Sequence, residues 1–404
     1  MERMNQIPER QRLLDAVDAI APRVREDANQ AERDRHLPAA TVEALDEAGI
    51  LQMMWPRSLG GFEADPLTQH EVIARLAYHD ASTAWCAFIG AGSSAFAAGN
   101  IPGEGLEEVS SSMRAKRSVE WARMAGSPNP SGQAVPCDGG YRVSGRWGWL
   151  SGVHHADWVF VGSPILREGQ QQLTDFGMPE SLLFVVPIEE VEIEDSWMTA
   201  GLSGTGSAHV QTHNLFVPVH RTIDFPFNTP KRGGPLFNLP TLGFFGPAFS
   251  GFPQGVGRRA LDEIIDLAGR KNRIMAGSPL SERGAFQRDL GEMHDRLRSA
   301  ERLVHFELDR LWHGLLNEES PTPLESAELM SAFTTNAEAA LAATELAYRY
   351  SGGDGVFLES PFQRQMRDMR VASQHILIGE YNYEGTARAL LEKAAPQPQV
   401  LSNE

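Results

Sequence analysis

The sequence predicts an α+β protein that is mostly helical, with a β region between two helical regions. Two observations predict this order. Apolar residues recur three or four positions apart in the first and last parts of the chain, whereas short β-branched or alternating runs fill the middle. The length of 404 residues leaves room for two or three domains. We therefore expect a helical domain over residues 1–113, a β domain over 114–226 and a helical bundle over 227–404.

The N-terminal region begins with an amphipathic segment in which Leu13, Val17 and Val24 keep helical spacing. A second, short helix is expected after Pro38, a residue favoured at the first helical position. Gly49 suits the position just past its end. Residues 66–98, rich in Ala and Ser, are expected to be helical as well.

The middle region is expected to form strands. Residues 140–152 alternate after a Gly139-Gly140 turn, and the runs at 156–162, 181–188 and 209–219 are short, apolar and β-branched. Several short strands separated by turns predict a small barrel or a sandwich.

The C-terminal region returns to helical periodicity. Four segments carry it, the last of which is a pair of helices: 255–271, 283–316, 323–350 and 361–393. Long helices with continuous apolar stripes indicate a bundle.

Composition excludes several classes of protein. With 53 acidic and 36 basic residues, the net charge of −17 argues against a nucleic-acid partner. The first residues lack the apolar core of a signal peptide, so we expect a cytoplasmic protein that does not enter a membrane. The two cysteines and twelve histidines show no metal-ligand spacing, and His154-His155 is expected to be a surface pair on a strand.

Residues 146–152, Arg-Trp-Gly-Trp-Leu-Ser-Gly, are unusual for a plain scaffold. On a strand, Trp149 and Ser151 would share one face. An indole beside a hydroxyl and a glycine suits a planar heteroaromatic ligand. Two indoles in a β core are the other interpretation, and the spacing leaves both open.

Two further segments have the composition of binding loops. Backbone amides and hydroxyls of Gly204–Ser207 suit an anion or a ring edge, or form a plain turn. Gly352 is expected to end a helix with a positive φ. Arg364, Asp368 and His375 are expected on one amphipathic helix, where the first two could form an ion pair and Asp368 and His375 could face one groove.

Taken in order, these segments resemble the acyl-CoA dehydrogenase fold. The resemblance rests on residues 53–62 with their Pro and Gly-Gly, on 201–218 ending in Val-Pro, and on the Gly-rich 351–357 followed by Arg-Asp in 363–370. It covers nearly the whole chain. It implies a helical N-terminal domain, a central β-barrel domain, a C-terminal four-helix bundle, and a homotetramer with flavin at subunit interfaces.

Within that fold, the chain is similar to the oxygenase components of two-component flavin-dependent monooxygenases. The matching segments are Pro130–Ala134, Gly139–Tyr141, Gly145–Trp147, Ser151-Gly152 and His375. The helix containing Asp80–Trp85 resembles the substrate-side helix of that branch, although Ser93 stands where several hydroxylases carry His.

The resemblance implies that a separate reductase supplies reduced flavin, FMNH2 or FADH2, and that O2 is the cosubstrate. Oxygenation would pass through a C4a-hydroperoxide. Ser151 would bond the flavin N5/O4 edge, and His375 would be an acid/base with a pKa suited to neutral pH. Further flavin contacts are implied for Trp121, Trp149, Thr205, Ser207, Gly352 and Gly353, with Arg283 and Phe286 reaching the flavin of a neighbouring subunit.

Trp85, Phe88 and Phe245 are the expected substrate contacts, for a small aromatic or natural-product substrate. Two alternatives stay open. Tyr383–Thr386 is a Tyr-Glu-Gly-Thr box, eight residues late, in which Glu384 would be the base of an acyl-CoA dehydrogenase. The fold could also be a non-catalytic scaffold.

Overall fold

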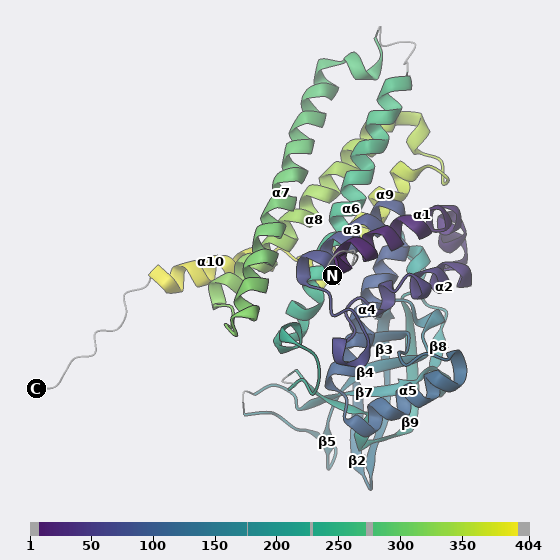
Figure 1. Cartoon of the computed structure of the whole chain (residues 1–404), viewed down its shortest axis with the longest axis vertical. Helices are drawn as coiled ribbons and strands as arrows, with labels where there is room; N and C mark the ends of the chain where they lie inside the picture. The colour runs from purple at the N-terminus through teal and green to yellow at the C-terminus, as the bar shows by residue number, and fades with distance from the viewer. Residues whose placement is uncertain (1–7, 176, 227–228, 272–277, 395–404) are drawn as a thin grey trace, which may run out of the picture.

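A computed structural model describes residues 8–175, 177–226, 229–271 and 278–394. Its helices gather around a long bundle, and its strands form a separate β region at one end of the molecule (Figure 1). The expected order of helices, strands and helices is confirmed. The division into three domains at the stated boundaries stays a prediction; helix α5 continues to Arg117, past the first of them.

The N-terminal helices are α1 (Glu9–Asp34), α2 (Ala39–Glu47), α3 (Pro66–His79), α4 (Ala81–Asn100) and α5 (Gly103–Arg117). Gly49 has φ 76°, as expected past a helix end. The single helix expected over 66–98 is two, because the Asp80 carboxylate accepts the Thr83 N–H at 2.8 Å and thereby begins a new helix. Helix α4 is buried over most of its length.

The strands form two four-stranded sheets. One sheet has the order β1-β4-β7-β10, in which only β1 and β4 are parallel, and the other has the antiparallel order β2-β3-β9-β8. Their bounds are β1 (Met124–Ser127), β2 (Gly132–Cys137), β3 (Gly140–Leu150), β4 (Trp158–Pro164), β7 (Ser181–Pro187), β8 (Glu192–Glu194), β9 (Ala208–Pro218) and β10 (Thr222–Phe225). A short pair, β5 (Leu166–Arg167) and β6 (Gln170–Gln171), lies outside them.

Side chains from both sheets fill one apolar core, which includes Val143, Trp147, Val161, Phe184 and Val210. Two sheets that share a core form a sandwich, one of the two arrangements that the strand pattern predicted.

The C-terminal helices are α6 (Thr241–Arg270), α7 (Gly284–Leu316), α8 (Pro323–Ser351), α9 (Pro361–Ala372) and α10 (Tyr381–Ala394). Helix α6 begins well before the expected residue 255 and contains Pro247 and Pro253. Helix α8 begins with a capping box between Thr322 and Glu325. Gly352, at the end of α8, has the expected positive φ of 57°.

Helices α3 and α6 cross in close backbone contact, and this crossing joins the N-terminal helices to the bundle. A Cβ at Gly251 would overlap the His70 carbonyl oxygen, and one at Gly255 would overlap the Ala74 carbonyl oxygen. Glycine is therefore required at both positions. Over the described ranges, every helix is too short or too polar to cross a membrane.

Candidate active site

Trp85 on α4 lies between the two residues predicted to be catalytic. Its indole N–H donates to the Ser151 Oγ at 3.0 Å. Its ring lies 5.5 Å from the His375 ring, centroid to centroid, in an edge-on arrangement. The indole is 7% exposed. A residue predicted as a substrate contact thus joins Ser151 and His375 into one site.

Ser151 follows strand β3 directly, in a turn completed by Gly152 with φ 77°. Its Oγ bonds the Ser207 Oγ at 2.7 Å, and the Ser207 Oγ bonds the Thr205 Oγ1 at 2.7 Å. Thr205 ends the short helix η5 (Ser203–Thr205). Ser151, Ser207 and Thr205, all predicted as flavin contacts, are therefore joined by hydrogen bonds.

Trp149 does not share a face with Ser151, and that expectation is wrong. The β3–β9 register is irregular between Trp147 and Leu150, and Trp149 has φ 62°. This irregularity leaves the Trp149 side chain 66% exposed, whereas Ser151 is buried. Trp147 is the core indole, and its N–H donates to the Gly162 carbonyl at 2.6 Å.

His375 lies beyond α9, not on it. Helix α9 ends at Ala372, and His375 precedes the short helix η11 (Ile376–Ile378). The expectation that Arg364, Asp368 and His375 share one helix is therefore wrong. The His375 ring stacks on Phe249 with centroids 5.1 Å apart.

The protonation state of His375 follows from its surroundings. Its Nδ1 accepts the Leu377 N–H at 3.3 Å, which leaves the proton of the neutral ring on Nε2. Burial lowers the pKa of His375 to about 4. The expectation of a pKa near neutral is wrong, because the partly apolar environment disfavours the charged imidazolium.

Asp368 on α9 ties the last helices to the loop that contains Leu202. Its Oδ1 accepts the Leu202 N–H at 2.6 Å, and its side chain is buried. Burial raises the pKa of Asp368 to about 7, and the nearby Asp80 carboxylate acts in the same direction. Arg364 does not pair with Asp368 as one interpretation proposed; it contacts Asn29 and Glu32 on α1.

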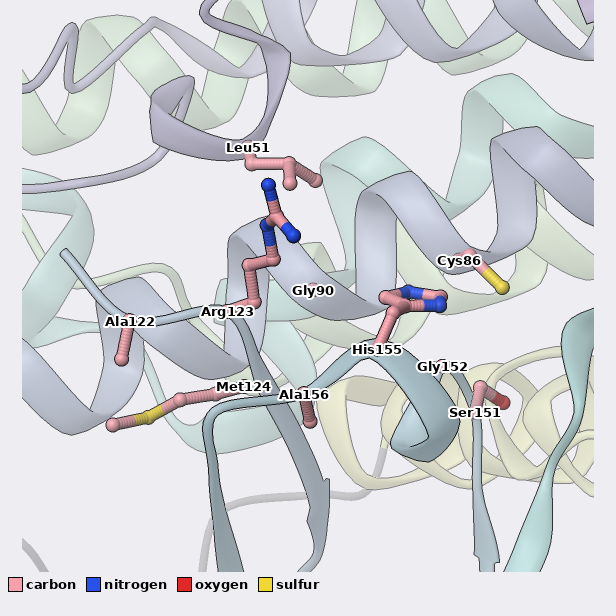
Figure 2. A pocket seen from close by; sticks show the side chains of 10 residues that line it. All are labelled: Leu51, Cys86, Gly90, Ala122, Arg123, Met124, Ser151, Gly152, His155 and Ala156. Atoms are coloured by element: carbon pink, nitrogen blue, oxygen red, sulfur yellow. The ribbon is translucent and has the colours of Figure 1, made fainter. Parts of the chain in front are cut away.

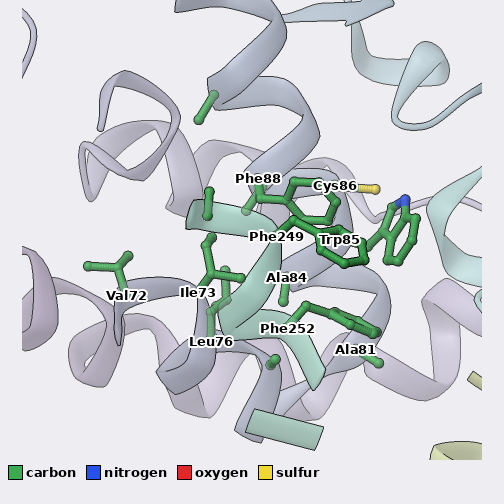
Figure 3. Close-up of a cluster of buried hydrophobic side chains, with 14 of the residues drawn as sticks. Val72, Ile73, Leu76, Ala81, Ala84, Trp85, Cys86, Phe88, Phe249 and Phe252 are labelled. Carbon is green, nitrogen blue, oxygen red and sulfur yellow. The ribbon is translucent and has the colours of Figure 1, made fainter. Parts of the chain in front are cut away.

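Aromatic rings enclose the indole of Trp85. Its ring centroid lies 5.2 Å from that of Phe88, 5.7 Å from that of Phe249 and 5.1 Å from that of Phe252 (Figure 3). Phe249 and Phe252 were not predicted. Together with Phe245 they keep helical spacing, a signal obscured by the two prolines of α6. Phe245 lies in an adjoining cluster, 5.6 Å from Phe244, centroid to centroid.

A pocket lies beside Ser151, between α4, strand β1 and the two short helices η1 (Ile50–Gln52) and η3 (Val153–His155) (Figure 2). The residues that line it are Leu51, Cys86, Gly90, Ala122, Arg123, Met124, Ser151, Gly152, His155 and Ala156. Its walls are mostly apolar, with a few polar atoms from Ser151, Arg123 and His155. Such a lining suits a flat heteroaromatic ring.

His155 is a functional candidate that the sequence did not reveal. It lies on η3, not on a strand, and its half-buried ring lines the pocket, so the expectation of a surface pair with His154 is wrong. Its Nδ1 is buried with no partner among the described residues. Burial, assisted by the charge of Arg123, lowers the pKa of His155 to about 3.

Trp121 lies close to this pocket, next to Ala122 in sequence. Its indole N–H donates to the Asp46 Oδ1 at 2.9 Å, and Asp46 also holds Arg123 with a shortest distance of 2.7 Å. The Trp121 polar atom is thus engaged by the protein, and any flavin contact would involve the ring face.

The remaining predicted cofactor residues lie at the far end of the bundle, away from the strands (Figure 1). Arg283 and Phe286 begin α7, whereas Gly352 and Gly353 follow α8. The Phe286 ring is buried and lies 4.9 Å from the Tyr350 ring, centroid to centroid. Within one chain these residues do not meet Ser151.

The Glu384 carboxylate of the alternative interpretation is exposed on α10, which extends from the side of the bundle (Figure 1). Neighbouring Thr386 donates to the Ala327 carbonyl at 3.0 Å, so this box joins α10 to α8. In the part of the chain that the structure describes, no group of three or more His, Cys, Asp or Glu side chains could hold a metal ion.

Helices that flank a two-sheet β unit, with an aromatic site where the three regions meet, define the acyl-CoA dehydrogenase fold. Family models agree: residues 8–110 match the acyl-CoA dehydrogenase N-terminal domain, and residues 248–380 match the C-terminal domain.

Within this fold, the chain belongs to the family of flavin-dependent monooxygenase oxygenase components. It is 30% identical to indole-3-acetate monooxygenase of Pseudomonas putida, an alignment that covers 96% of this chain and 95% of that protein. The crystal structure of the HsaA monooxygenase from M. tuberculosis superposes with a TM-score of 0.82 at 25% identity, covering 96% of this chain and 98% of that one. XiaF from Streptomyces sp., solved with FADH2 and glycerol, shares the fold with a TM-score of 0.83 at 24% identity and covers 97% of each chain.

Proposed function

We propose that this oxygenase component inserts one oxygen atom of O2 into a small, planar aromatic substrate held beside Trp85. One observation carries the proposal: Trp85 contacts both Ser151 and His375, so the flavin-side hydroxyl and the imidazole lie on either side of one indole. Reduced flavin, when bound, supplies the electrons that activate O2.

We place the flavin ring system beside Ser151, at the mostly apolar pocket that this residue lines. The His155 Nδ1, buried with no partner among the described residues, is a polar atom that a donor or acceptor of the ring would satisfy. Ser151 would bond the N5/O4 edge. Thr205 and Ser207 would act from behind Ser151, since their hydroxyls already bond each other. Both FMN and FAD are compatible with these contacts.

His375 would act as a neutral imidazole. Because Nδ1 is occupied by the Leu377 N–H, Nε2 is the atom left for chemistry. In the neutral form Nε2–H donates a hydrogen bond to an oxygen atom of the substrate or to the oxygen being transferred. To act as a general acid, the ring would take a proton at Nδ1, in place of the bond from the Leu377 N–H, when Nε2 releases its own proton. The aromatic surroundings exclude water and so limit the competing release of H2O2 without product.

The substrate is proposed from the ring cluster. Trp85 and Phe88, with Phe249 added by the structure, present ring faces and edges that suit an aromatic substrate. The names of two relatives point the same way, one an indole-3-acetate monooxygenase and the other a resorcinol hydroxylase. Phe245 would lie further out, in the adjoining cluster.

The partners and setting are proposed from the family. A separate flavin reductase would deliver reduced flavin by diffusion, in the cytoplasm and without a membrane or nucleic-acid partner. We propose a homotetramer, in which Arg283, Phe286, Gly352 and Gly353 contact the flavin of a neighbouring subunit, since they lie far from Ser151 of their own chain. Trp121 and Trp149 would contact the flavin through their ring faces.

Anaerobic titration with chemically reduced FMN and FAD, followed by addition of O2 and a panel of phenols and indoles, tests the proposal. We expect binding of reduced flavin and an oxygenated aromatic product. Oxidised flavin that copurifies and is bleached by an acyl-CoA would instead support a dehydrogenase based on Glu384. Failure to bind either redox form would support the scaffold interpretation.

His375→Ala separates binding from chemistry. We expect product formation to fall at least ~100-fold, the usual share of a general acid/base. Binding of reduced flavin should change less than about twofold, because the ring contacts of His375 are to Trp85 and Phe249. Hydroxylation that survives this change would remove His375 from the mechanism.

A further inference from the structure

Ser250 on α6 joins three helices at the residue that follows Phe249. Its Oγ bonds the His70 Nδ1 of α3 at 2.8 Å, and its carbonyl accepts an N–H of the Asn336 amide of α8 at 2.9 Å. The side chains of all three residues are buried. The Ser250 Oγ also donates to the Pro247 carbonyl of its own helix at 2.8 Å. Two neighbouring helices therefore hold α6 at this one position.

This part of α6 lacks some of the usual helical hydrogen bonds. Proline has no N–H, so Pro253 cannot donate to the Phe249 carbonyl four residues earlier, and Pro247 cannot donate to the Gly243 carbonyl. The stretch that carries Phe249 therefore depends more than an ordinary helix on bonds from its neighbours. The bonds to Ser250 are of this kind.

His70 contacts α6 at the two residues that follow Phe249. The bond to Ser250 is the only hydrogen bond of the His70 side chain within the described residues, where Nε2 is buried without a partner. The His70 carbonyl meets the next residue, since a Cβ at Gly251 would overlap it. Burial lowers the pKa of His70 to about 3, so the bonding ring is neutral.

Phe249 carries the position of α6 to the candidate active site. Its ring stacks on His375, with centroids 5.1 Å apart and planes at 23°, and packs edge-on against Trp85 and Phe88 at 5.7 and 5.4 Å. The Leu377 N–H bonds the His375 Nδ1, but one hydrogen bond lets the ring turn about it. Stacking against Phe249 restricts that rotation and so directs Nε2.

We propose that His70 is a positioning residue for oxygen transfer. Its bond to Ser250 fixes where the Phe249 ring lies, and that ring directs the His375 Nε2. The proposal rests on the proposed role of His375 as the acid/base. A displacement of about 1 Å at a reacting group can cost up to ~100-fold in rate, so a contact this remote can set the outcome of the reaction.

His70→Leu and His70→Asn are a matched pair of variants. Leu and Asn have nearly the same size and shape and both remove the ring, but only the Asn amide can bond the Ser250 Oγ from the position of Nδ1. Each variant would be loaded anaerobically with dithionite-reduced FMN or FAD and an aromatic substrate. After addition of O2, product and H2O2 would be measured per flavin oxidised.

We expect His70→Leu to lower the product per flavin roughly tenfold, with a matching rise in H2O2, whereas His70→Asn stays within about twofold of wild type. Binding of reduced flavin should change less than about twofold in both variants, because His70 is not among the residues that line the pocket beside Ser151.

Ser250→Ala breaks the same bond from α6 and keeps the His70 ring, so it tests the proposal even if His70→Leu does not fold. We expect the same loss of product. Thr344→Val is the matched control, because the buried Thr344 hydroxyl of α8 also donates to a carbonyl three residues earlier, at 2.8 Å. It should leave the product per flavin unchanged. Thermal unfolding would confirm that each variant is folded.

A double-mutant cycle tests the route through Phe249. Phe249→Leu alone should lower the product per flavin about as His70→Leu does. If His70 acts through this ring, adding His70→Leu to Phe249→Leu should lower the product by less than about twofold more, instead of multiplying the two losses.

The outcomes separate this inference from the proposed function. Equal effects of His70→Leu and His70→Asn, or losses that multiply in the cycle, overturn the inference and leave the proposed function standing. Hydroxylation that survives His375→Ala overturns the inference together with the role of His375. Wild type that forms no oxygenated product overturns both proposals.

Discussion

Replacing Asp368 with Asn should stabilise the protein at alkaline pH but much less at acidic pH. The Asp368 carboxyl has a pKa of about 7 in the folded chain because it is buried, whereas an unfolded Asp titrates near pH ~3.9. Since the folded pKa is the higher one, the folded state binds the proton more tightly. The unfolding free energy therefore falls as the pH rises from the unfolded to the folded pKa.

The size of this effect follows from the two pKa values. Titration of Asp368 lowers the unfolding free energy by about 1.5 kcal/mol at pH 5 and by about 4 kcal/mol at pH 8. Asn keeps an oxygen that can accept the Leu202 N–H but has no proton to lose. Any fixed change in that hydrogen bond is the same at both pH values and cancels. The stability gained by Asp368→Asn should thus be about 3 kcal/mol greater at pH 8 than at pH 5.

Urea unfolding of wild type and variant at the two pH values measures this difference directly. Asp65→Asn is the matched control, because Asp65 is a half-buried carboxylate whose Oδ1 accepts a backbone N–H, that of Thr68, at 3.0 Å. Subtracting its result at each pH removes the general effect of replacing a carboxylate that accepts a backbone N–H with an amide. An Asp368→Asn effect that is identical at pH 5 and pH 8 would refute the reasoning, since it would mean that Asp368 has the same pKa in both states.

Three further predictions follow from the packing and charges. Trp85→Phe loses the N–H that donates to Ser151 and should lower the unfolding free energy by about 2 kcal/mol. It should also raise the fraction of reduced flavin that is oxidised without product, measured as H2O2 released per flavin. Gly251→Ala should cost about 3 kcal/mol or prevent folding because of the His70 carbonyl, whereas Gly269→Ala, whose Cβ has open space, should be neutral or stabilising in thermal unfolding. Burial keeps four histidines neutral in the folded chain: His70, His79, His155 and His375. The unfolding free energy should therefore fall on acidification from about pH 6.5, by about 1.4 kcal/mol per pH unit for each of them, partly offset by Asp368. Urea titrations at acid pH that show a flat profile would exclude this.

Periodicity predicted most of the fold because it reports on which face of an element is buried. Helix α7 was expected at 283–316 and lies at Gly284–Leu316, since its apolar stripe is continuous. The first half of α6 was missed because Pro247 and Pro253 usually end helices. Here packing of that half against α3 and α4 outweighs the propensity, and Phe249 reaches the site as a result.

The site was predicted in part, and the errors have local geometric causes. Short motifs predicted Ser151 and His375, and the structure brings both against Trp85. The face shared by Trp149 and Ser151 was wrong because one irregular β3–β9 pairing turns the intervening residues. The position of His155 in the pocket wall depends on a helical turn between strands, which alternation cannot reveal. The bond from Asp368 to Leu202 joins residues far apart in the sequence, so only the folded chain shows it.

That long-range bond explains why the site needs all three regions of the chain. Trp85 comes from the N-terminal helices, Ser151 from the β region, and His375 from the last turns after α9. Asp368 accepts the Leu202 N–H, and the Leu202 carbonyl accepts from Thr205. The hydroxyls of Thr205, Ser207 and Ser151 bond in series and reach the Trp85 indole, which contacts His375. The contacts form a closed circuit, so moving α9 would shift the His375 imidazole and the Ser151 hydroxyl together. The geometry of oxygen transfer therefore depends on how the helices dock on the sheets, and a substitution at Asp368 should change coupling of flavin oxidation to product even though its carboxylate bonds neither Ser151 nor His375.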